Sequence, residues 1–197
     1  MRKPFLLGLV IVALAALGLA AYSLGVLARG VPELHGTELD QPPSVGDVRL
    51  QAGQGNSVRL ADYAGRYLVV FFGYTNCPDV CPLTMARLGS AFRALGEPED
   101  LQVVMVTVDP ERDTPDVIDA YARRFHPAFD GLGGTREQVD AAAGRFFIGH
   151  RDPGDGNVIH GSQVLLVDPD SRLWRVYNDE SQLYLEDDLR KLLGSAG

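Results

Sequence analysis

The stretch that decides the fold is residues 68–95, LVVFFGYTNCPDVCPLTMARLGSAFRAL, together with residues 101–108, LQVVMVTV. Residues 68–72 form a short apolar run of the length typical of a buried strand, and residues 101–108 form a second one. Between them, apolar residues at positions 85, 88, 92 and 95 have the spacing of one helix face, and Gly96 is expected just after the helix end. A strand, a helix and a strand in this order predict a βαβ unit with parallel strands.

The segments after this unit predict three more helices and a hairpin. Thr114 is expected to cap a helix with Pro115 at its first position and with Tyr121 and Phe125 on one side. Thr135 and Gln138 have the spacing of a capping box for a helix that ends near residue 147. Strands are expected at 164–167 and 173–177, joined by a turn at 168–171, and a final helix at 185–193 closed by Gly194. This order predicts an α/β fold, a thioredoxin-like sandwich with a central mixed sheet and flanking helices.

The N-terminus has the pattern of a membrane segment. Arg2 and Lys3 precede a stretch without charge from Pro4 to Ala28, which as a helix would be about 37 Å long at 1.5 Å per residue. A bilayer core is about 30 Å thick. We therefore expect residues 1–29 to form one transmembrane helix, with a cleaved signal as the alternative.

The positive charges before this segment place the N-terminus in the cytoplasm and the rest of the chain outside it. Residues 30–44 are expected to be a linker, and residues 45–197 the folded domain. The predicted location is the cell inner membrane, crossed once, with the soluble domain on the periplasmic side.

Composition narrows the class of protein. The chain has 197 residues, a formal net charge of −8 and 46% hydrophobic residues. The apolar content excludes a disordered protein, and the length allows one domain with a real core. The sequence has no basic cluster, so it lacks the electrostatic footprint of a nucleic-acid-binding protein.

The only two cysteines, Cys77 and Cys81, lie close together. Two cysteines are too few for the disulfide scaffold of a domain of this size, so the pair suggests a site. The Cys77 loop follows strand 68–72, and residues 109–114 follow strand 101–108. His160 comes just before strand 164–167, and if that strand is antiparallel to the others, all three segments meet at one edge of the sheet.

These residue types suit copper. Pro82 indicates that a helix starts nearby, and the peptide dipoles at a helix N-terminus favour a thiolate. Soft thiolates select copper(I), and imidazole also suits copper, so two sulfurs and one nitrogen would form a three-coordinate site. Taken singly, the cysteine pair would favour a structural or redox disulfide, and His160 would be an ordinary surface or core residue.

The other histidines are examples of the usual case for this residue type, a surface residue or a core residue with a hydrogen-bond partner. His35 lies in the predicted linker, His126 precedes a proline at a helix end, and His150 lies in a polar loop. None of the three is expected to bind the metal.

Three segments together resemble the Sco/SenC family. Residues 73–82, GYTNCPDVCP, and residues 109–115, DPERDTP, are similar to its signatures. His160-Gly161-Ser162, ahead of a strand that ends in Val167-Asp168-Pro169, is similar to its third element. The resemblance covers about residues 45–195. It implies a thioredoxin fold and a copper chaperone that helps to build the binuclear copper centre of cytochrome c oxidase.

The resemblance implies that Cys77, Cys81 and His160 of this chain bind copper(I), copper(II) or both. The implied partners are the copper-receiving subunit of the oxidase, other copper carriers or a thiol reductant, and the membrane. The family more often has an acidic residue directly before the histidine, where this chain has Ile159. The run 109–115 is either a turn with a helix cap or a segment that shapes the copper rim or a partner surface.

The sequence leaves two main functions open. The first is a metal carrier rather than an enzyme, which passes copper to the oxidase by ligand exchange. The second is a thiol–disulfide oxidoreductase that reduces the cysteines of the oxidase copper site, with Cys77 and Cys81 as its redox pair. A peroxidase is a third and weaker alternative. Thioredoxin-type redox motifs are CxxC, one residue shorter than this pair, which favours the carrier.

Overall fold

The computed structural model describes residues 33–151, 159–160 and 162–195, together with residues 14, 16 and 17. The chain divides into two compact units, Met1–Leu34 and His35–Gly197, and the fold below is that of the second. The transmembrane helix expected in residues 1–29 falls outside the described residues, apart from Leu14, Ala16 and Leu17. Within the part of the chain that is described, no helix has the length and apolar character to cross a bilayer.

The domain is built on a six-stranded mixed sheet with strand order β1-β10-β9-β4-β5-β6. Its strands are β1 (Thr37–Glu38), β4 (Tyr67–Gly73), β5 (Leu101–Thr107), β6 (Asp130–Leu132), β9 (Val164–Val167) and β10 (Leu173–Tyr177). β4 and β5 are parallel and paired from Tyr67–Leu101 to Gly73–Thr107, which confirms the predicted βαβ unit.

The second half of the sheet is antiparallel, as predicted. β9 pairs antiparallel with β10 and with β4, and Val164 lies opposite Phe71. The connecting turn is closed by the N–H of Ser171, which donates to the carbonyl of Asp168 at 3.0 Å. The start of β9 therefore lies at the same sheet edge as the carboxyl ends of β4 and β5.

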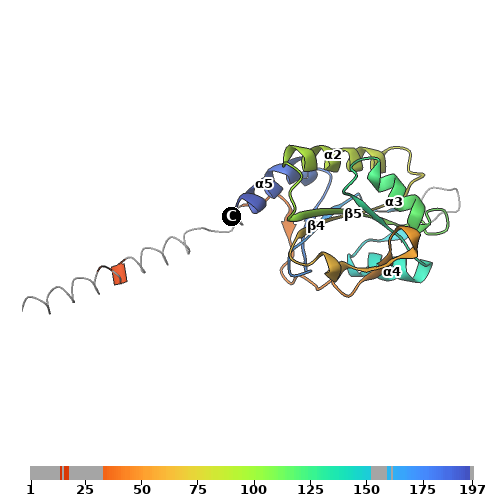
Figure 1. Ribbon diagram of the computed structural model, residues 1–197, viewed down its shortest axis with the longest axis horizontal. Helices are drawn as coiled ribbons and strands as arrows, with labels where there is room; N and C mark the ends of the chain where they lie inside the picture. Colours follow the sequence, from red (N-terminus) through yellow and green to blue (C-terminus); the bar gives the residue numbers. More distant parts are fainter. Residues whose placement is uncertain (1–13, 15, 18–32, 152–158, 161, 196–197) are drawn as a thin grey trace, which may run out of the picture. The chain divides into compact units, whose positions relative to one another are not determined.

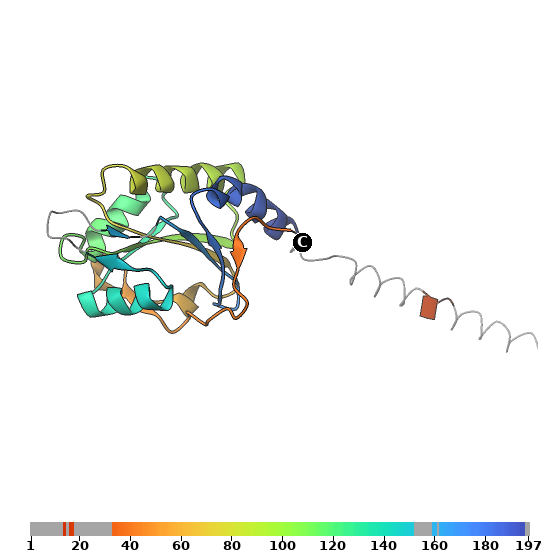
Figure 2. The same ribbon diagram turned by 180° about the vertical axis from the view of Figure 1, so that it is seen from behind.

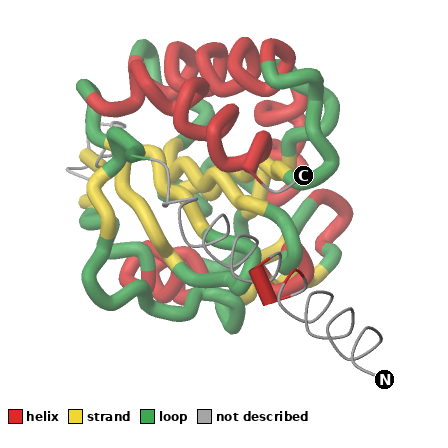
Figure 3. Tube along the Cα trace, turned by 90° about the vertical axis from the view of Figure 1, so that its left-hand side faces the viewer, coloured by secondary structure: helices red, strands yellow, loops and turns green. Residues whose placement is uncertain are grey.

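Helices cover both faces of the sheet. They are α2 (Val80–Ala94), α3 (Pro115–Arg123), α4 (Arg136–Arg145) and α5 (Leu185–Ser195). α2, α3 and α5 lie on one face and α4 lies on the other (Figures 1 and 2). Seen along the sheet, the strands form the middle layer between the helices (Figure 3). Val69, Val70 and Phe71 are fully buried, which explains why this strand is apolar at every position.

The predicted helix ends are mostly confirmed. Gly96 has φ +82, its N–H donates to the carbonyl of Arg93, and the N–H of Glu97 donates to that of Phe92, both at 3.0 Å. This is a Schellman motif. The Thr135–Gln138 capping box is also present.

Two details of the predicted helix ends are wrong. Thr114 occupies the N-cap position, but its side chain makes no capping hydrogen bond. The last helix continues through Gly194 to Ser195. Gly194 does not have the positive φ of a residue that terminates a helix.

Several short elements were not predicted. They are β1, β6, the hairpin of β2 (Arg49–Gln51) and β3 (Ser57–Arg59), and the hairpin of β7 (His150–Arg151) and β8 (Ile159–His160). β1 lies within residues 30–44, so part of the predicted linker is an edge strand paired with β10. β6 contains Gly131, where a Cβ atom would lie 2.1 Å from the carbonyl oxygen of Ile118. Only glycine allows α3 to approach this strand so closely.

Candidate metal centre

The two cysteines lie one helical turn apart at the carboxyl edge of β4. Cys77 is in the loop after β4, and Cys81 is in the first turn of α2, which begins two residues before Pro82. The first turn has no intrahelical acceptors for its N–H groups, so proline is tolerated there. The N–H of Cys81 donates to Sγ of Cys77 at 3.4 Å. Cys77 and Cys81 are not joined in a disulfide.

The two thiols have opposite environments. Cys77 is partly exposed, and burial acts to raise its pKa, but hydrogen bonds from the backbone N–H groups of Asp79, Cys81 and Val80 and from the Cys81 side chain lower the pKa overall. Cys81 is 0% exposed. Burial raises the pKa of Cys81 far above its usual range; a backbone hydrogen bond with Tyr74 acts against this, and the hydrogen bond with the Cys77 side chain and the charges of Cys77 and Asp113 add to it. The pair therefore consists of an accessible thiol that ionises readily and a buried thiol that stays protonated in the absence of a metal.

Close packing at the end of β4 brings Cys81 against the sheet. A Cβ atom on Gly73 would lie 3.0 Å from Sγ of Cys81 and 2.9 Å from Cε of Met105. Contacts this short are tighter than almost all those that real Cβ atoms make, so glycine lets the strand end lie against the thiol without displacing Met105 or Cys81.

A buried carboxylate fixes the cysteine loop. Asp113, 1% exposed, accepts a hydrogen bond from the N–H of Thr75 at 2.8 Å and from the hydroxyl of Thr107 at 2.9 Å. The Thr75 hydroxyl also donates to it. Asp113 itself is held in a turn, since its N–H donates to the carbonyl of Asp109 at 2.9 Å.

The run 109–115 thus forms the expected turn without the side-chain cap, and its Asp113 braces the cysteine loop. A role of this run in shaping the copper rim or a partner surface stays a prediction. Asp113 had not been singled out as a site residue. The signal that could have identified it is topological, because its loop and the cysteine loop follow adjacent parallel strands.

Tyr121 on α3 is a second residue that sequence reasoning did not connect with the site. It packs against Phe125, with ring centroids 5.2 Å apart, as the helical spacing predicted. Burial raises the pKa of Tyr121 to about 12, and the charges that Cys81 and Cys77 would carry when ionised add to this shift. Tyr121 therefore lies within electrostatic range of both thiols.

The third predicted ligand, His160, is in β8. β8 pairs with β7, and His160 is the register partner of His150. Val164, four residues after His160, lies opposite Phe71 near the end of β4. The backbone thus leads from β8 to the predicted edge, but the side chains of His160 and Ile159 fall outside the described part of the structure.

Among the residues that are described, no group of three or more His, Cys, Asp or Glu side chains is arranged to hold a metal ion. The ligand set of Cys77, Cys81 and His160 stays a prediction.

Two of the other histidines have structural partners. Nε2 of His126, which is buried, lies 3.4 Å from Glu97, and its ring packs edge-on against Phe92 at 4.8 Å. Nδ1 of His35 lies 2.8 Å from the carboxylate of Asp188. Both imidazoles stabilise the fold, which agrees with the ordinary role expected for them.

Comparison with known proteins supports a single family. The SCO1/SenC family model matches residues 37–193. The mitochondrial SCO2 homologue of Danio rerio is 35% identical over 141 residues, which are 68% of this chain and 50% of the relative. The chain thus spans about half the length of that relative.

Solved structures of Sco proteins are similar to this one. Arabidopsis thaliana ScoI with copper bound has a TM-score of 0.67 and 26% identity, covering 81% of this chain and 98% of the other. BsSco, described as a member of the Sco family of cytochrome c oxidase assembly proteins with a disulfide switch, has a TM-score of 0.63 and 26% identity, covering 80% and 96%. The predicted α/β sandwich is the fold of these proteins, and with the family model matching most of its length, the chain belongs to the SCO1/SenC family.

Proposed function

We propose that this domain is a copper chaperone that binds copper through Cys77, Cys81 and His160 and delivers it to the binuclear copper centre of cytochrome c oxidase. The observation that carries the proposal is the cysteine pair, four residues apart at the start of α2, in which the Cys81 N–H donates to Cys77 Sγ at 3.4 Å. The pair lies at the edge toward which the His160 strand leads. Two thiolates and an imidazole suit copper(I), and a relative of the same fold binds copper.

The difference in exposure between the Cys77 and Cys81 thiols suits a site that must release its copper to a partner. Copper(I) with two thiolates carries a net charge of −1, and the backbone N–H groups around Cys77 stabilise negative charge there. Cys77 is the accessible sulfur, so an incoming ligand from a partner replaces it first, and the buried Cys81 releases the metal last. The Asp113 brace keeps the loop in place while the ligands change.

The proposal includes an anchor in residues 1–29 and a domain on the periplasmic side of the inner membrane. Arg2 and Lys3, ahead of the apolar stretch, support this orientation. A reporter fused after Gly197 is expected to be active only outside the cytoplasm. Activity of the fusion in the cytoplasm would contradict export.

A second candidate function, reduction of the oxidase cysteines, is favoured by the asymmetry of the thiols. The Cys77 thiolate would attack one sulfur of the target disulfide and form a mixed disulfide, while the target's other sulfur leaves as a thiolate and takes up a proton from solvent. The Cys81 thiol, giving up its proton, would then displace the target's second thiolate, which takes up a proton. The target leaves as a dithiol, and a separate thiol reductant must reduce the new Cys77–Cys81 disulfide.

Metal binding is tested on the full chain, purified in detergent and reduced. X-ray absorption is expected to show one copper(I) per chain with two sulfur neighbours and one nitrogen neighbour. Cys77→Ala and Cys81→Ala should abolish tight binding, while His126→Ala and His150→Ala, the matched controls for His160→Ala, should retain it. Unchanged copper content in Cys81→Ala would exclude the two-sulfur site.

His160→Ala separates the two functions. A thiol–disulfide cycle does not need an imidazole, whereas the proposed copper site loses its third ligand. Cells with His160→Ala should assemble little of the binuclear copper centre, with partial rescue by added copper, while the purified variant still cycles between dithiol and disulfide. Normal assembly by this variant at low copper, with failure only when a cysteine is lost, would favour the reductase.

A further inference from the structure

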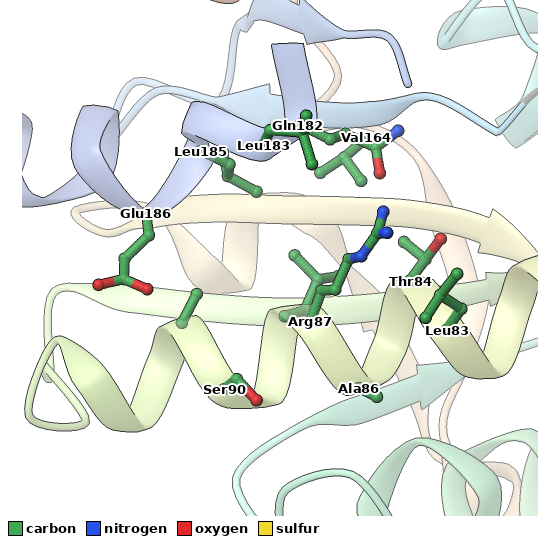
Figure 4. Close-up of a pocket in the computed structure, with 12 residues that line it drawn as sticks. Leu83, Thr84, Ala86, Arg87, Ser90, Val164, Gln182, Leu183, Leu185 and Glu186 are labelled. Carbon is green, nitrogen blue, oxygen red and sulfur yellow. The ribbon is translucent and has the colours of Figure 1, made fainter. Parts of the chain in front are cut away.

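A groove of about 390 Å³ lies between α2 and the C-terminal segment. Its walls come from α2, from the 3-10 helix η3 (Ser181–Tyr184) and from the start of α5 (Figure 4). Leu83 lines the groove two residues after Cys81, and Val164 lines it at the start of β9. The groove therefore begins at the sheet edge where the cysteines lie and continues along α2.

Apolar side chains are exposed along this groove. Leu83 on α2 is 48% exposed and Leu183 on η3 is 65% exposed. Val80 and Tyr184, on the same two elements, are also exposed. Grouped exposed apolar side chains of this kind are typical of an interaction site.

The groove also contains one uncompensated charge. Arg87 extends from α2 toward η3 (Figure 4) and makes no ion pair or hydrogen bond with any residue that the structure describes. Glu186, at the other end of the groove, is paired with Arg190 at 2.8 Å. The free charge in the groove is thus positive, in a chain whose net charge is −8.

We propose that this groove docks the protein that exchanges copper with Cys77 and Cys81, an inference that rests on the proposed function. The docked segment places an apolar side chain between Leu83 and Leu183 and a carboxylate against Arg87. A partner held there lies next to the cysteine edge, where its own ligands can reach Cys77. A second copy of this chain is disfavoured as the occupant, because two molecules of charge −8 repel each other.

The test compares Arg87→Glu with the matched control Arg49→Glu in the full chain. Arg49 is also exposed and without a partner among the described residues, but it is in β2, which packs against α4 on the other face of the sheet. The probe is the soluble copper-binding domain of the oxidase subunit, free of metal. Copper(I) affinity is measured by competition with a chelator, and the rate of copper transfer to the probe by stopped flow.

Arg87→Glu is expected to keep wild-type copper affinity and to transfer copper about tenfold more slowly at low salt, with a smaller difference at high salt. Leu183→Asp should also slow transfer without changing the affinity, and Arg49→Glu should behave as wild type. Equal rates for Arg87→Glu and Arg49→Glu would overturn the inference while leaving the copper function intact.

Other results of the same experiments would assign the groove a different role or overturn the docking proposal. A loss of copper affinity in Arg87→Glu would make the groove part of the metal site rather than a docking surface. A wild-type dimer, detected by sedimentation and abolished by Arg87→Glu, would assign the groove to a second copy. A wild-type chain that binds no copper would overturn both proposals, and one that binds copper but transfers none to the probe would overturn only the docking partner.

Discussion

Two buried carboxylates hold two different parts of this molecule, and Asp188 also has a cation nearby, because Nζ of Lys191 lies 3.6 Å from it. Asp113 accepts hydrogen bonds from Thr75 and Thr107, which have neutral side chains. Asp188, 0% exposed, accepts from the backbone N–H of His35 at 2.6 Å and from the Tyr177 hydroxyl at 3.0 Å, and Nδ1 of His35 lies 2.8 Å away. The ring of His35 also stacks on Tyr184 at 4.1 Å.

The comparison indicates that the same kind of contact, a buried carboxylate that accepts several hydrogen bonds, serves the candidate site in one region and the stability of the fold in the other. Each carboxylate is buried and holds a segment that lies outside the central strands, since a buried charge must be matched by several donors. Asp113 holds the loop that carries Cys77, so its loss should affect the chemistry. Asp188 fastens the first residues of the domain to α5, so its loss should affect only stability.

Asp113→Ala is expected to have the largest effect. It leaves the Thr75 and Thr107 donors without their acceptor and frees the cysteine loop. The copper(I) affinity should fall about 10–100-fold, and the free energy of unfolding by about 2–4 kcal/mol. Chelator competition and urea unfolding measure the two quantities. A folded variant with wild-type copper affinity would show that the brace does not serve the site.

Asp188→Ala should lower the free energy of unfolding by about 2–3 kcal/mol, because the buried Tyr177 hydroxyl loses its acceptor. Its copper affinity should stay within about twofold of wild type, well below the tenfold that 1.4 kcal/mol represents. The same two measurements apply. A fall in affinity as large as that of Asp113→Ala would remove the distinction between the two carboxylates.

The acid dependence of stability sharpens the comparison. Burial acts to raise the pKa of Asp188, but hydrogen bonds from His35 and Tyr177 lower it overall. A group with a lowered folded-state pKa contributes stability above its unfolded pKa, about 3.9, and loses it as the pH falls through the folded value.

The stability difference between wild type and Asp188→Asn should therefore shrink steadily as the pH falls below about 4. Urea unfolding at a series of pH values measures it. A difference that does not change with pH would mean that the carboxylate is not charged in the folded protein.

Thr75→Val should have the smallest effect. It removes the hydroxyl bond to Asp113 but keeps the backbone bond of 2.8 Å. The expected loss is about 1 kcal/mol of stability, with a copper affinity lowered a few-fold. Thr135→Val is the matched control, because it removes the α4 cap at a similar cost, about 1 kcal/mol, without touching the loop. Equal copper affinities for the two variants would show that the Thr75 hydroxyl does not tune the site.

Much of this protein could be predicted from the sequence, because the signals are local. The alternation of apolar runs and helical spacing predicted β4, α2 and β5, and the Gly96 and Thr135 helix ends depend on residues only a few positions apart. The cysteine pair and its placement at a strand end followed from the same reasoning. The motifs around Cys77 and Asp109 were enough to indicate the family.

The rest was decided by contacts between residues far apart in the chain. β6 is three residues long and depends on the close packing of Gly131 against α3, so it has no periodic pattern from which it could be predicted. Whether residues 35–38 are linker or domain depends on Asp188, about 150 positions away. Likewise Asp113 becomes a brace only because β4 and β5 pair in parallel and bring Thr75 to it. Hydrogen bonds and close packing of this kind depend on positions in space, and those positions exist only once the sheet has formed.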